Sequence, residues 1–372
     1  MVWGDRMSTV VQAEKAGAKI VDWYSCIISR SIDQAILLKE QASALVKNME
    51  PNDKILAYYS LVEFRHEMLL RQNAGMEEEE RFAKIEPILE DTVDHLLKYL
   101  YYFISGQNEY INERYKSAIK LFRKAERLLE YVDDDAEEAE FYYYAGAVCY
   151  RLNQYPFAVS YTEQAKTIFD RLGYVEKAIN CQIIMAGINS DIKMYTKAAE
   201  ILKDALQQAH MYPESKALVF RARGLNAIRK REWEEAEHYF RSALAIREHR
   251  QSPIGMKSQY NLANILFRLQ RDLEAREFFK KAEVGIHYYR NIEYSARSLV
   301  TKGLYIEKGN LALVNKGIDL LREHSLEFEI AEVAEETSAY LEKAGKSQEA
   351  LKYMKVAYEA RLKQNALGVD QA

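Results

Sequence analysis

Small and apolar residues recur at a fixed spacing along most of this chain. Within residues 224–243, which read GLNAIRKREWEEAEHYFRSA, Gly224, Ala236, Phe240 and Ala243 stand at offsets of 0, 12, 16 and 19. Small residues let two helices approach closely, and an aromatic ring fills the space beside them. The pattern therefore predicts two antiparallel helices that touch at Gly224 and Ala236. One such hairpin cannot bury its own apolar face, so it requires neighbours.

Five further copies of this skeleton follow the same offsets. They are Gly106/Ala118/Phe122/Ala125, Gly146/Ala158/Thr162/Ala165, Ala186/Ala198/Leu202/Ala205, Ala263/Ala275/Phe279/Ala282 and Ser338/Ala350/Met354/Ala357. The second-helix alanines are separated by 40, 40, 38, 39 and then 75 residues, and the last gap is about twice the others. We therefore expect a degenerate copy within 294–321, around Gly303. The arrangement is typical of tetratricopeptide repeats, and it predicts seven of them over residues 85–372.

The first part of the chain, residues 1–72, does not follow the skeleton. Its apolar residues recur every three or four positions, which predicts a bundle of three antiparallel helices. Pro51 separates the second helix from the third, because proline cannot continue a helix. Four consecutive glutamates within residues 73–84 indicate a solvated linker. The predicted helices of the bundle are 10–29, 32–48 and 53–71.

Composition agrees with an all-α protein. Hydrophobic residues make up 48% of the 372 positions, while five prolines and 15 glycines are too few to punctuate a β-rich chain of this size. A net charge of −4 and the lack of a helix-turn-helix pattern argue against direct nucleic-acid binding. No signal peptide, membrane-spanning run or cofactor motif is visible. We expect a cytoplasmic protein whose widely spaced cysteines, Cys26, Cys149 and Cys181, are structural thiols and not metal ligands.

Three segments resemble the Rap family of Bacillus and its relatives. They are WYSCIISRSIDQA at 23–35, NMEPNDKILAYYSLVEFRHEMLL at 48–70 and ERLLEYVDDDAEEAEFYYYAG at 126–146. The resemblance covers nearly the whole chain. It implies a quorum-sensing regulator of sporulation or competence whose N-terminal bundle and first repeats bind a response regulator. A short signalling peptide, secreted and then imported again, would bind in the groove of the repeats.

The resemblance also implies a position for catalysis. In phosphatase members of the family, a glutamine orients the water that attacks the aspartyl phosphate of the response regulator, a role also found in GTPases. That position falls on Asp53 here, whose negative charge would repel the phosphoryl group. Asn52 offers a carboxamide one position earlier. Both residues can instead cap a helix, and His66 is better explained by a structural hydrogen bond than by general-base catalysis.

Acidic residues are the candidates for contact with the response regulator. By resemblance, we assign this contact to Glu50, Asp134 and Asp135. The alternative for the aspartates is a solvated loop that caps the helix beginning near Ala136.

The first helix of each repeat supplies the candidates for peptide binding. These helices line the groove of a repeat superhelix, and carboxamides on them can bind both the N–H and the C=O groups of an extended peptide. Cations can hold a terminal carboxylate. By resemblance, Asp191 pairs with a basic side chain of the peptide, whereas the anchoring asparagine of the family is replaced by Ala222. The peptide-binding candidates are Asp191, Arg221, Ala222, Arg229, Lys257, Asn261 and Asn264, and the alternative for each is a polar position wetted by water.

Two functions follow from these residues. The first is a regulator that works by binding its partner, and the second is an aspartyl-phosphate phosphatase that acts on the same kind of partner. A repeat scaffold that has lost both ligands is a third reading. Asp53 in place of glutamine is the feature that separates the first two.

Overall fold

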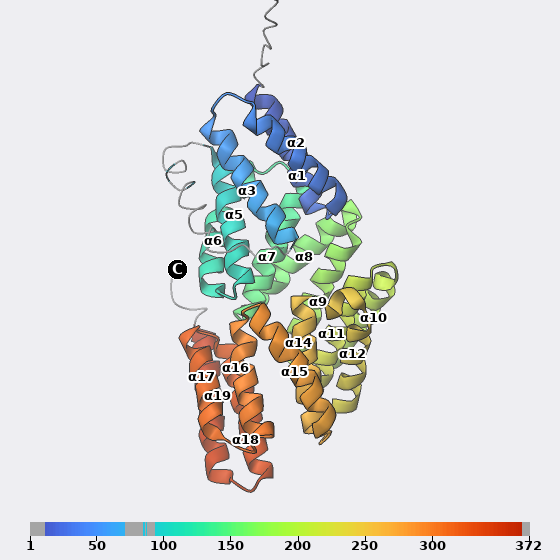
Figure 1. Ribbon diagram of the computed structural model, residues 1–372, viewed down its shortest axis with the longest axis vertical. Coiled ribbons are helices and arrows are strands. Elements are labelled where there is room, and N and C mark those ends of the chain that lie inside the picture. The colour runs from blue at the N-terminus through green and yellow to red at the C-terminus, as the bar shows by residue number, and fades with distance from the viewer. Residues whose placement is uncertain (1–11, 71–84, 86, 88–93, 367–372) are drawn as a thin grey trace, which may run out of the picture. The chain divides into compact units, whose positions relative to one another are not determined.

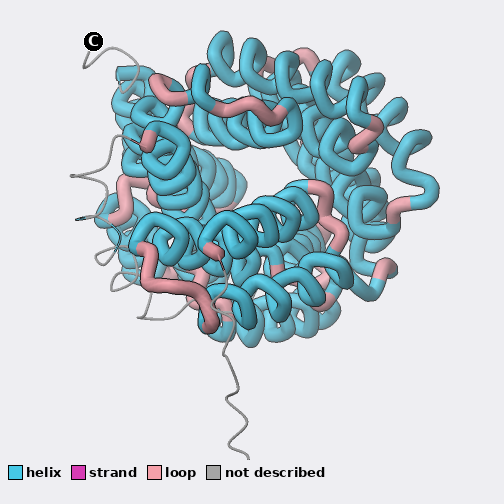
Figure 2. The backbone as a smooth tube through the Cα atoms, turned by 90° about the horizontal axis from the view of Figure 1, so that it is seen from above, coloured by secondary structure: helices cyan, strands magenta, loops and turns pink. Residues whose placement is uncertain are grey.

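The computed structural model describes residues 12–70, 85, 87 and 94–366, and these residues form helices and loops without a β-strand (Figures 1 and 2). The all-α prediction is confirmed. The chain divides into two compact units, the first formed by Met1–Val148 and Thr167–Tyr174 and the second by Cys149–Lys166 and Val175–Ala372. Of the helices described, none combines the length and apolar character needed to cross a bilayer.

The first unit begins with three helices, α1 (Ala13–Ile28), α2 (Ile32–Lys47) and α3 (Asp53–Leu69). Their ends lie within three residues of the predicted helices. Trp23 is fully buried at the centre of the bundle, with Ile20, Leu38 and Val62 in the same apolar cluster. The predicted linker, 73–84, lies outside the described residues, and the predicted division at residue 72 stays a prediction.

The first repeat packs with the bundle inside the same unit. Its helices are α5 (His95–Ile111) and α6 (Tyr115–Glu126), followed by the short helix η1 (Leu129–Tyr131) and by α7 (Asp135–Arg151), which opens the second repeat. A Cβ atom on Gly106 would lie 2.5 Å from the Phe122 ring, so glycine is needed there. Phe103, Phe122 and Phe141 contact one another in a buried aromatic core.

The second unit holds the remaining repeats. Its helices, drawn from green to red in Figure 1, are α8 (Tyr155–Leu172, up to Lys166), α9 (Val175–Asp191), α10 (Tyr195–Gln208), η2 (Ala209–Met211), α11 (Pro213–Lys230), α12 (Trp233–Ala245), α13 (Arg247–Arg250), α14 (Pro253–Arg268), α15 (Asp272–Tyr288), α16 (Ile292–Thr301), η3 (Lys302–Ile306), α17 (Leu311–Glu323), α18 (Glu327–Lys343) and α19 (Ser347–Ala366).

The predicted skeleton explains how most pairs of helices pack. In the last pair the predicted wedge residue Met354 is instead exposed, and its neighbour Tyr353 is buried. Ala198, Ala236, Ala275 and their equivalents are almost fully buried. A Cβ atom on Gly224 would lie 2.8 Å from the Phe240 ring, as expected for helices in close contact. Counting helix pairs from α5/α6 to α18/α19 gives the seven predicted repeats over the described residues.

The degenerate repeat is the pair α16 and α17. A π-helical turn, η3, follows α16 and contains Gly303. Two glycines make close approaches in this pair. A Cβ atom on Gly303 would lie 2.7 Å from the carbonyl oxygen of Asn310, and one on Gly317 would lie 2.6 Å from the carbonyl oxygen of Ala296. Position 315, at the usual offset from Gly303, is an asparagine. The second-helix alanine of the skeleton is therefore missing in this pair, and the helix that precedes it ends in a π-helical turn.

Candidate functional site

The peptide-binding candidates lie in the second unit, on the first helices of three successive repeats. We call these positions the first-helix face, and they are Asp191 on α9, Arg221, Ala222 and Arg229 on α11, and Lys257, Asn261 and Asn264 on α14.

Asp191 is already paired within the chain. Its Oδ1 lies 2.6 Å from Nε of Arg229, and the Tyr155 hydroxyl donates to its Oδ2 at 3.5 Å. Only 6% of the Asp191 side chain is exposed. Burial raises the pKa of Asp191 above its usual value, although Arg229 opposes the shift. A basic peptide side chain would therefore have to compete with Arg229 for this carboxylate.

The α14 candidates form one stripe along their helix. Lys257, Asn261 and Asn264 are separated by four and three residues, a spacing that places them on one side. Nζ of Lys257 lies 3.6 Å from Oε2 of Glu293 on α16. The Asn264 amide donates to Oε1 of Glu336 on α18 at 2.8 Å. These contacts join α14 to the two repeats that follow it.

Two candidates have polar atoms with no hydrogen-bond partner among the described residues. These atoms are Nε of Arg221 and Nδ2 of Asn261, both buried. Ala222, by contrast, packs against the apolar cluster between α9, α10 and α11. The structure thus leaves hydrogen-bond donors, and not acceptors, unused at these positions of the first-helix face.

Sequence reasoning missed a set of glutamates that face these residues. We call them the acidic row, and they are Glu293 on α16 and Glu329, Glu332 and Glu336 on α18. The three on α18 stand at spacings of three and four residues, which is a signal of one helical face. They were missed because the same spacing is also typical of a solvated helix surface.

Arginines of the chain neutralise the acidic row. Arg151 contacts Glu329, and its Nη2 lies 3.5 Å from Oε2 of Glu293. Arg297 contacts Glu293 at 2.9 Å and Glu332 at 2.6 Å. Burial raises the pKa of Glu329 to about 7 in spite of Arg151. Burial would also raise the pKa of Glu293, but Lys257, Arg297 and Arg151 together lower it to about 2.

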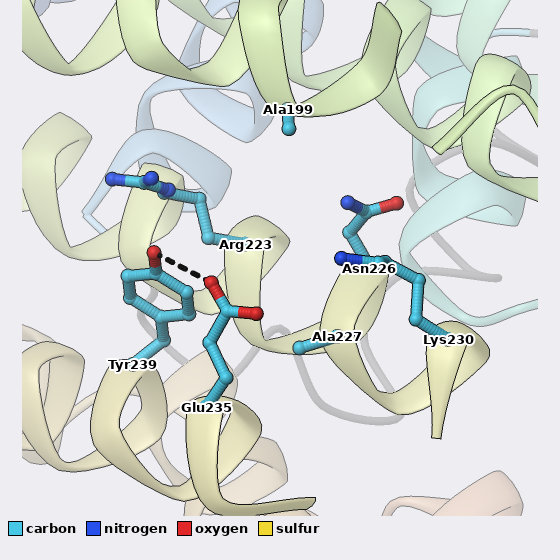
Figure 3. Close-up of a pocket in the computed structure, with 7 residues that line it drawn as sticks. All are labelled: Ala199, Arg223, Asn226, Ala227, Lys230, Glu235 and Tyr239. Atoms are coloured by element: carbon cyan, nitrogen blue, oxygen red, sulfur yellow. Dashed lines mark hydrogen bonds between the residues drawn. The ribbon is translucent and has the colours of Figure 1, made fainter. Parts of the chain in front are cut away.

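A small pocket lies on another side of α11 (Figure 3). The Arg223 guanidinium sits 4.5 Å above the Tyr239 ring, and the Tyr239 hydroxyl donates to Glu235 at 3.0 Å. Asn226 at the same pocket accepts from Ser190 at 2.8 Å. None of the predicted site residues lines this pocket, and its polar groups are held by contacts within the chain.

The candidates for catalysis lie in the first unit, at the connection between α2 and α3. Asn52 is the N-cap of α3, and its side-chain oxygen accepts from the backbone N–H of Ile55 at 3.0 Å. Asp53 is the first residue of α3 and is exposed, as is Glu50 before it. The helix-cap interpretation thus describes the contact that Asn52 makes, and a catalytic role for either residue stays a prediction.

The two aspartates assigned to partner binding make different contacts. Asp134 caps α7, since its Oδ1 accepts from the N–H groups of Ala136 at 2.8 Å and Glu137 at 3.0 Å. Asp135 lies 2.8 Å from Arg171, and both side chains are more than half exposed. Capping does not exclude a partner from this loop, because both aspartates remain exposed.

A buried polar cluster joins the bundle to α7 within the first unit. The Tyr24 hydroxyl on α1 donates to Glu137 at 3.0 Å, and Arg65 on α3 contacts Glu140 at 2.7 Å. Burial raises the pKa of Glu137 to about 7, with Arg65 opposing the shift. Nearby, His66 accepts a hydrogen bond from the Trp23 indole at 3.0 Å, the structural role expected for it. These contacts fix the bundle against the first repeats.

Known proteins resemble the chain over nearly its whole length. The family model described as response regulator aspartate phosphatase H, N terminal, matches residues 10–71. The Type II methyltransferase M.CeqI of Rhodococcus hoagii is 37% identical, and the match covers 98% of this chain and 71% of that protein. Response regulator aspartate phosphatase I of Bacillus subtilis (strain 168) is 27% identical, with 93% of this chain and 90% of that protein covered.

A solved structure shares both the bundle and the repeats. The crystal structure of a Rap protein complexed with competence and sporulation factor matches with a TM-score of 0.88 and 25% identity, over 95% of this chain and 99% of that one. The family model covers the three-helix bundle, and the solved structure extends the likeness through the repeats. The chain therefore belongs to the Rap family.

Proposed function

We propose that this protein is a quorum-sensing regulator that binds a response regulator through its N-terminal bundle and first repeats and is controlled by a short signalling peptide. The observation that carries the proposal is the match to Rap proteins over both the bundle and the repeats. A response regulator acts in the cytoplasm, where we expect this chain to act as well. Sporulation or competence is the process that the resemblance implies.

Contact with the response regulator is assigned to the first unit. Glu50, Asp134 and Asp135 are exposed there and carry negative charge. The buried ion pair of Arg65 and Glu140 holds α3 against α7. It therefore helps to fix the position of Glu50, which precedes α3, relative to Asp134 and Asp135 at the start of α7. A partner that spans the start of α3 and the loop before α7 would meet a rigid surface.

Peptide control is assigned to the second unit. The first-helix face carries carboxamides and cations on successive helices, as an extended peptide requires. A peptide can regulate the protein only if it binds one conformation more tightly than another. Contacts such as those of Arg151 with Glu293 and Glu329, which link repeats far apart in the chain, offer a set of interactions that a peptide can rearrange.

Partner binding without catalysis is favoured over phosphatase activity. The position of the water-orienting glutamine is occupied by Asp53, and the neighbouring Asn52 uses its carboxamide oxygen to cap α3. The names of the Bacillus relatives make dephosphorylation the second candidate. The methyltransferase name of the Rhodococcus relative has no counterpart in this proposal, because the described residues fold as the helical repeats of Rap proteins.

The test is to incubate the purified protein with a panel of phosphorylated response regulators and to follow complex formation and phosphate loss together. We expect a stable complex in which phosphate is retained. The Asp53→Gln variant should gain phosphatase activity if the rest of the site is intact. Rapid phosphate loss with the unaltered protein would establish the phosphatase alternative, and the absence of any complex would refute the regulator proposal.

A further inference from the structure

The last described helix, α19, presents a row of apolar side chains to solvent. We call this row the α19 stripe, and it consists of Leu351, Met354, Tyr358 and Leu362. Between 47% and 71% of each of these residues is exposed. They are spaced by three, four and four residues, which places them on one side of the helix. Large apolar side chains gathered in one exposed row are typical of a surface that another molecule covers.

The position of Met354 is not exposed in the earlier repeats. The same skeleton position is occupied there by Phe122, Leu202, Phe240 and Phe279. Their exposed fractions are at most 3%, against 47% for Met354. No helix follows α19 among the described residues (Figure 1). A terminal repeat that faces water needs a polar outer face, and the α19 stripe is not polar.

The order of the residues in the α19 stripe is nearly symmetric. Leu351 and Leu362 stand at its two ends, and Met354 and Tyr358 stand between them, so that both pairs are centred at residues 356–357. If a second α19 packs antiparallel against the first, Leu351 of each copy meets Leu362 of the other. Met354 of each copy then meets Tyr358 of the other. Contact about a two-fold axis requires a self-complementary surface of this kind.

Two charges beside the stripe have the same symmetry. Lys355 and Glu359 directly follow Met354 and Tyr358, so both lie on one flank of the stripe and are centred on residue 357. A two-fold axis places this flank of one copy beside the same flank of the other. Lys355 of each copy therefore meets Glu359 of the other. Within the chain the two groups lie 3.9 Å apart, with 76% and 56% of their side chains exposed, so both can reach a second copy.

We propose that the α19 stripe is a homodimer interface, in which two copies of α19 pack antiparallel about a two-fold axis. None of its residues is among those assigned to the peptide or to the response regulator, so dimerisation is independent of the proposed function. A contact between single helices is small. We therefore expect a reversible dimer that is largely formed at about 100 µM chain and largely dissociated at about 1 µM.

The experiment measures the mass of the full chain by sedimentation equilibrium over this range of concentrations. We expect the mass to rise from 43.3 kDa toward twice that value. Tyr358→Glu places a charge in the centre of the interface on both copies and should weaken the dimer by at least about a hundredfold. Tyr288→Glu is the matched control and should leave the dimer unchanged, since Tyr288 ends α15 and is 66% exposed, against 62% for Tyr358. Melting curves should show both variants folded, because both tyrosines are exposed in the monomer.

Exchange of the flanking charges tests the antiparallel arrangement. Lys355→Glu and Glu359→Lys should each weaken the dimer about fivefold, because like charges then face each other across the axis. An equimolar mixture of these two variants should associate about as strongly as the unaltered protein, since each copy supplies the charge that the other lacks. A mass of 43.3 kDa at every concentration, or a dimer that survives Tyr358→Glu, overturns the proposed interface. A mixture that stays as weak as the single variants overturns the antiparallel pairing.

Discussion

Each unit of this protein contains a buried ionic cluster, and the two are built differently. In the first unit, the bundle cluster consists of Tyr24, Arg65, Glu137 and Glu140, with one cation for two carboxylates and a hydroxyl to satisfy the other. In the second unit, the acidic row is served by several cations, among them Arg151, a quarter of whose side chain is exposed. The first arrangement, with a single cation, holds α1 and α3 against α7. The second has alternatives, which is what exchange with a ligand requires.

Removing the cation of the bundle cluster should have the largest effect. Arg65→Met removes the guanidinium that pairs with the fully buried Glu140, and breaking a buried ion pair in this way costs about 3–5 kcal/mol. Urea unfolding followed by circular dichroism measures the loss. Arg322→Met removes an exposed pair with Asp319 and should cost less than about 0.5 kcal/mol.

Replacing both partners of the pair sharpens this result. The double variant Arg65→Met, Glu140→Leu removes the uncompensated charge, so most of the lost stability should return. If the double variant is as unstable as Arg65→Met alone, the pair matters through its packing and not through its charge.

Glu137 should make the first unit sensitive to pH. Its pKa is raised from 4.5 to about 7 in the folded protein, so the stability it contributes is fully present below pH 4.5 and is lost as the pH rises through 7. Glu137→Gln removes the ionisable group. Between pH 5 and pH 8, the variant should lose about 2–3 kcal/mol less stability than the unaltered protein.

Unfolding in urea at both pH values measures this difference. Glu138→Gln, at the next position of α7, is the control and should follow the unaltered protein. An identical pH dependence for the Glu137 variant would mean that water reaches this carboxylate in the folded state.

Arg151→Gln should have a smaller effect than Arg65→Met. It removes a partner of Glu293 and Glu329, but Lys257 and Arg297 remain beside Glu293. We expect a loss of about 1–3 kcal/mol at neutral pH. Adding Glu329→Gln removes the carboxylate that Arg151 paired with and should restore part of the lost stability. A double-mutant cycle of unfolding free energies in urea measures this coupling. Strictly additive losses would show that Arg151 and Glu329 are not coupled.

The repeats could be predicted from the sequence because steric contacts leave a periodic trace. Gly224 and Phe240 stand at a fixed offset since the ring occupies the space where a Cβ atom would be. The π-helical turn after Thr301 could not be predicted, because no local sequence pattern indicates it. The turns between helices could not be located from glycines either, because residues such as Asn153 and Arg231 adopt the left-handed backbone conformation there.

The ionic contacts could not be predicted, because they join residues far apart in the chain. Arg151 meets Glu329 across 178 positions, and no periodicity links the two. For Asp191, the sequence indicated a charged position but not that Arg229 already occupies it. A charge pattern identifies which helix face is polar, whereas only the fold determines which charges are paired.

Substitution of Asn52 should have the smallest effect on stability, and it separates helix capping from catalysis. As an N-cap, Asn52 accepts from Ile55, and its loss should cost about 1 kcal/mol. As a water-positioning group it would need its carboxamide, which serine lacks. Asn52→Ala and Asn52→Ser separate these roles, because serine keeps the capping oxygen and removes the amide. Unfolding and phosphate loss from a phosphorylated response regulator are measured for both variants.

If Asn52 only caps α3, Asn52→Ser should match the unaltered protein in both measurements, and Asn52→Ala should lose stability alone. A variant that keeps its stability but loses a measurable phosphatase activity would assign catalysis to this carboxamide. The first unit would then contain a catalytic group in addition to its contacts with the response regulator, and it would no longer differ from the second unit only in the structure of its ionic cluster. We expect the serine variant to be indistinguishable, since the hydrogen bond to Ile55 already engages the oxygen that a water would need.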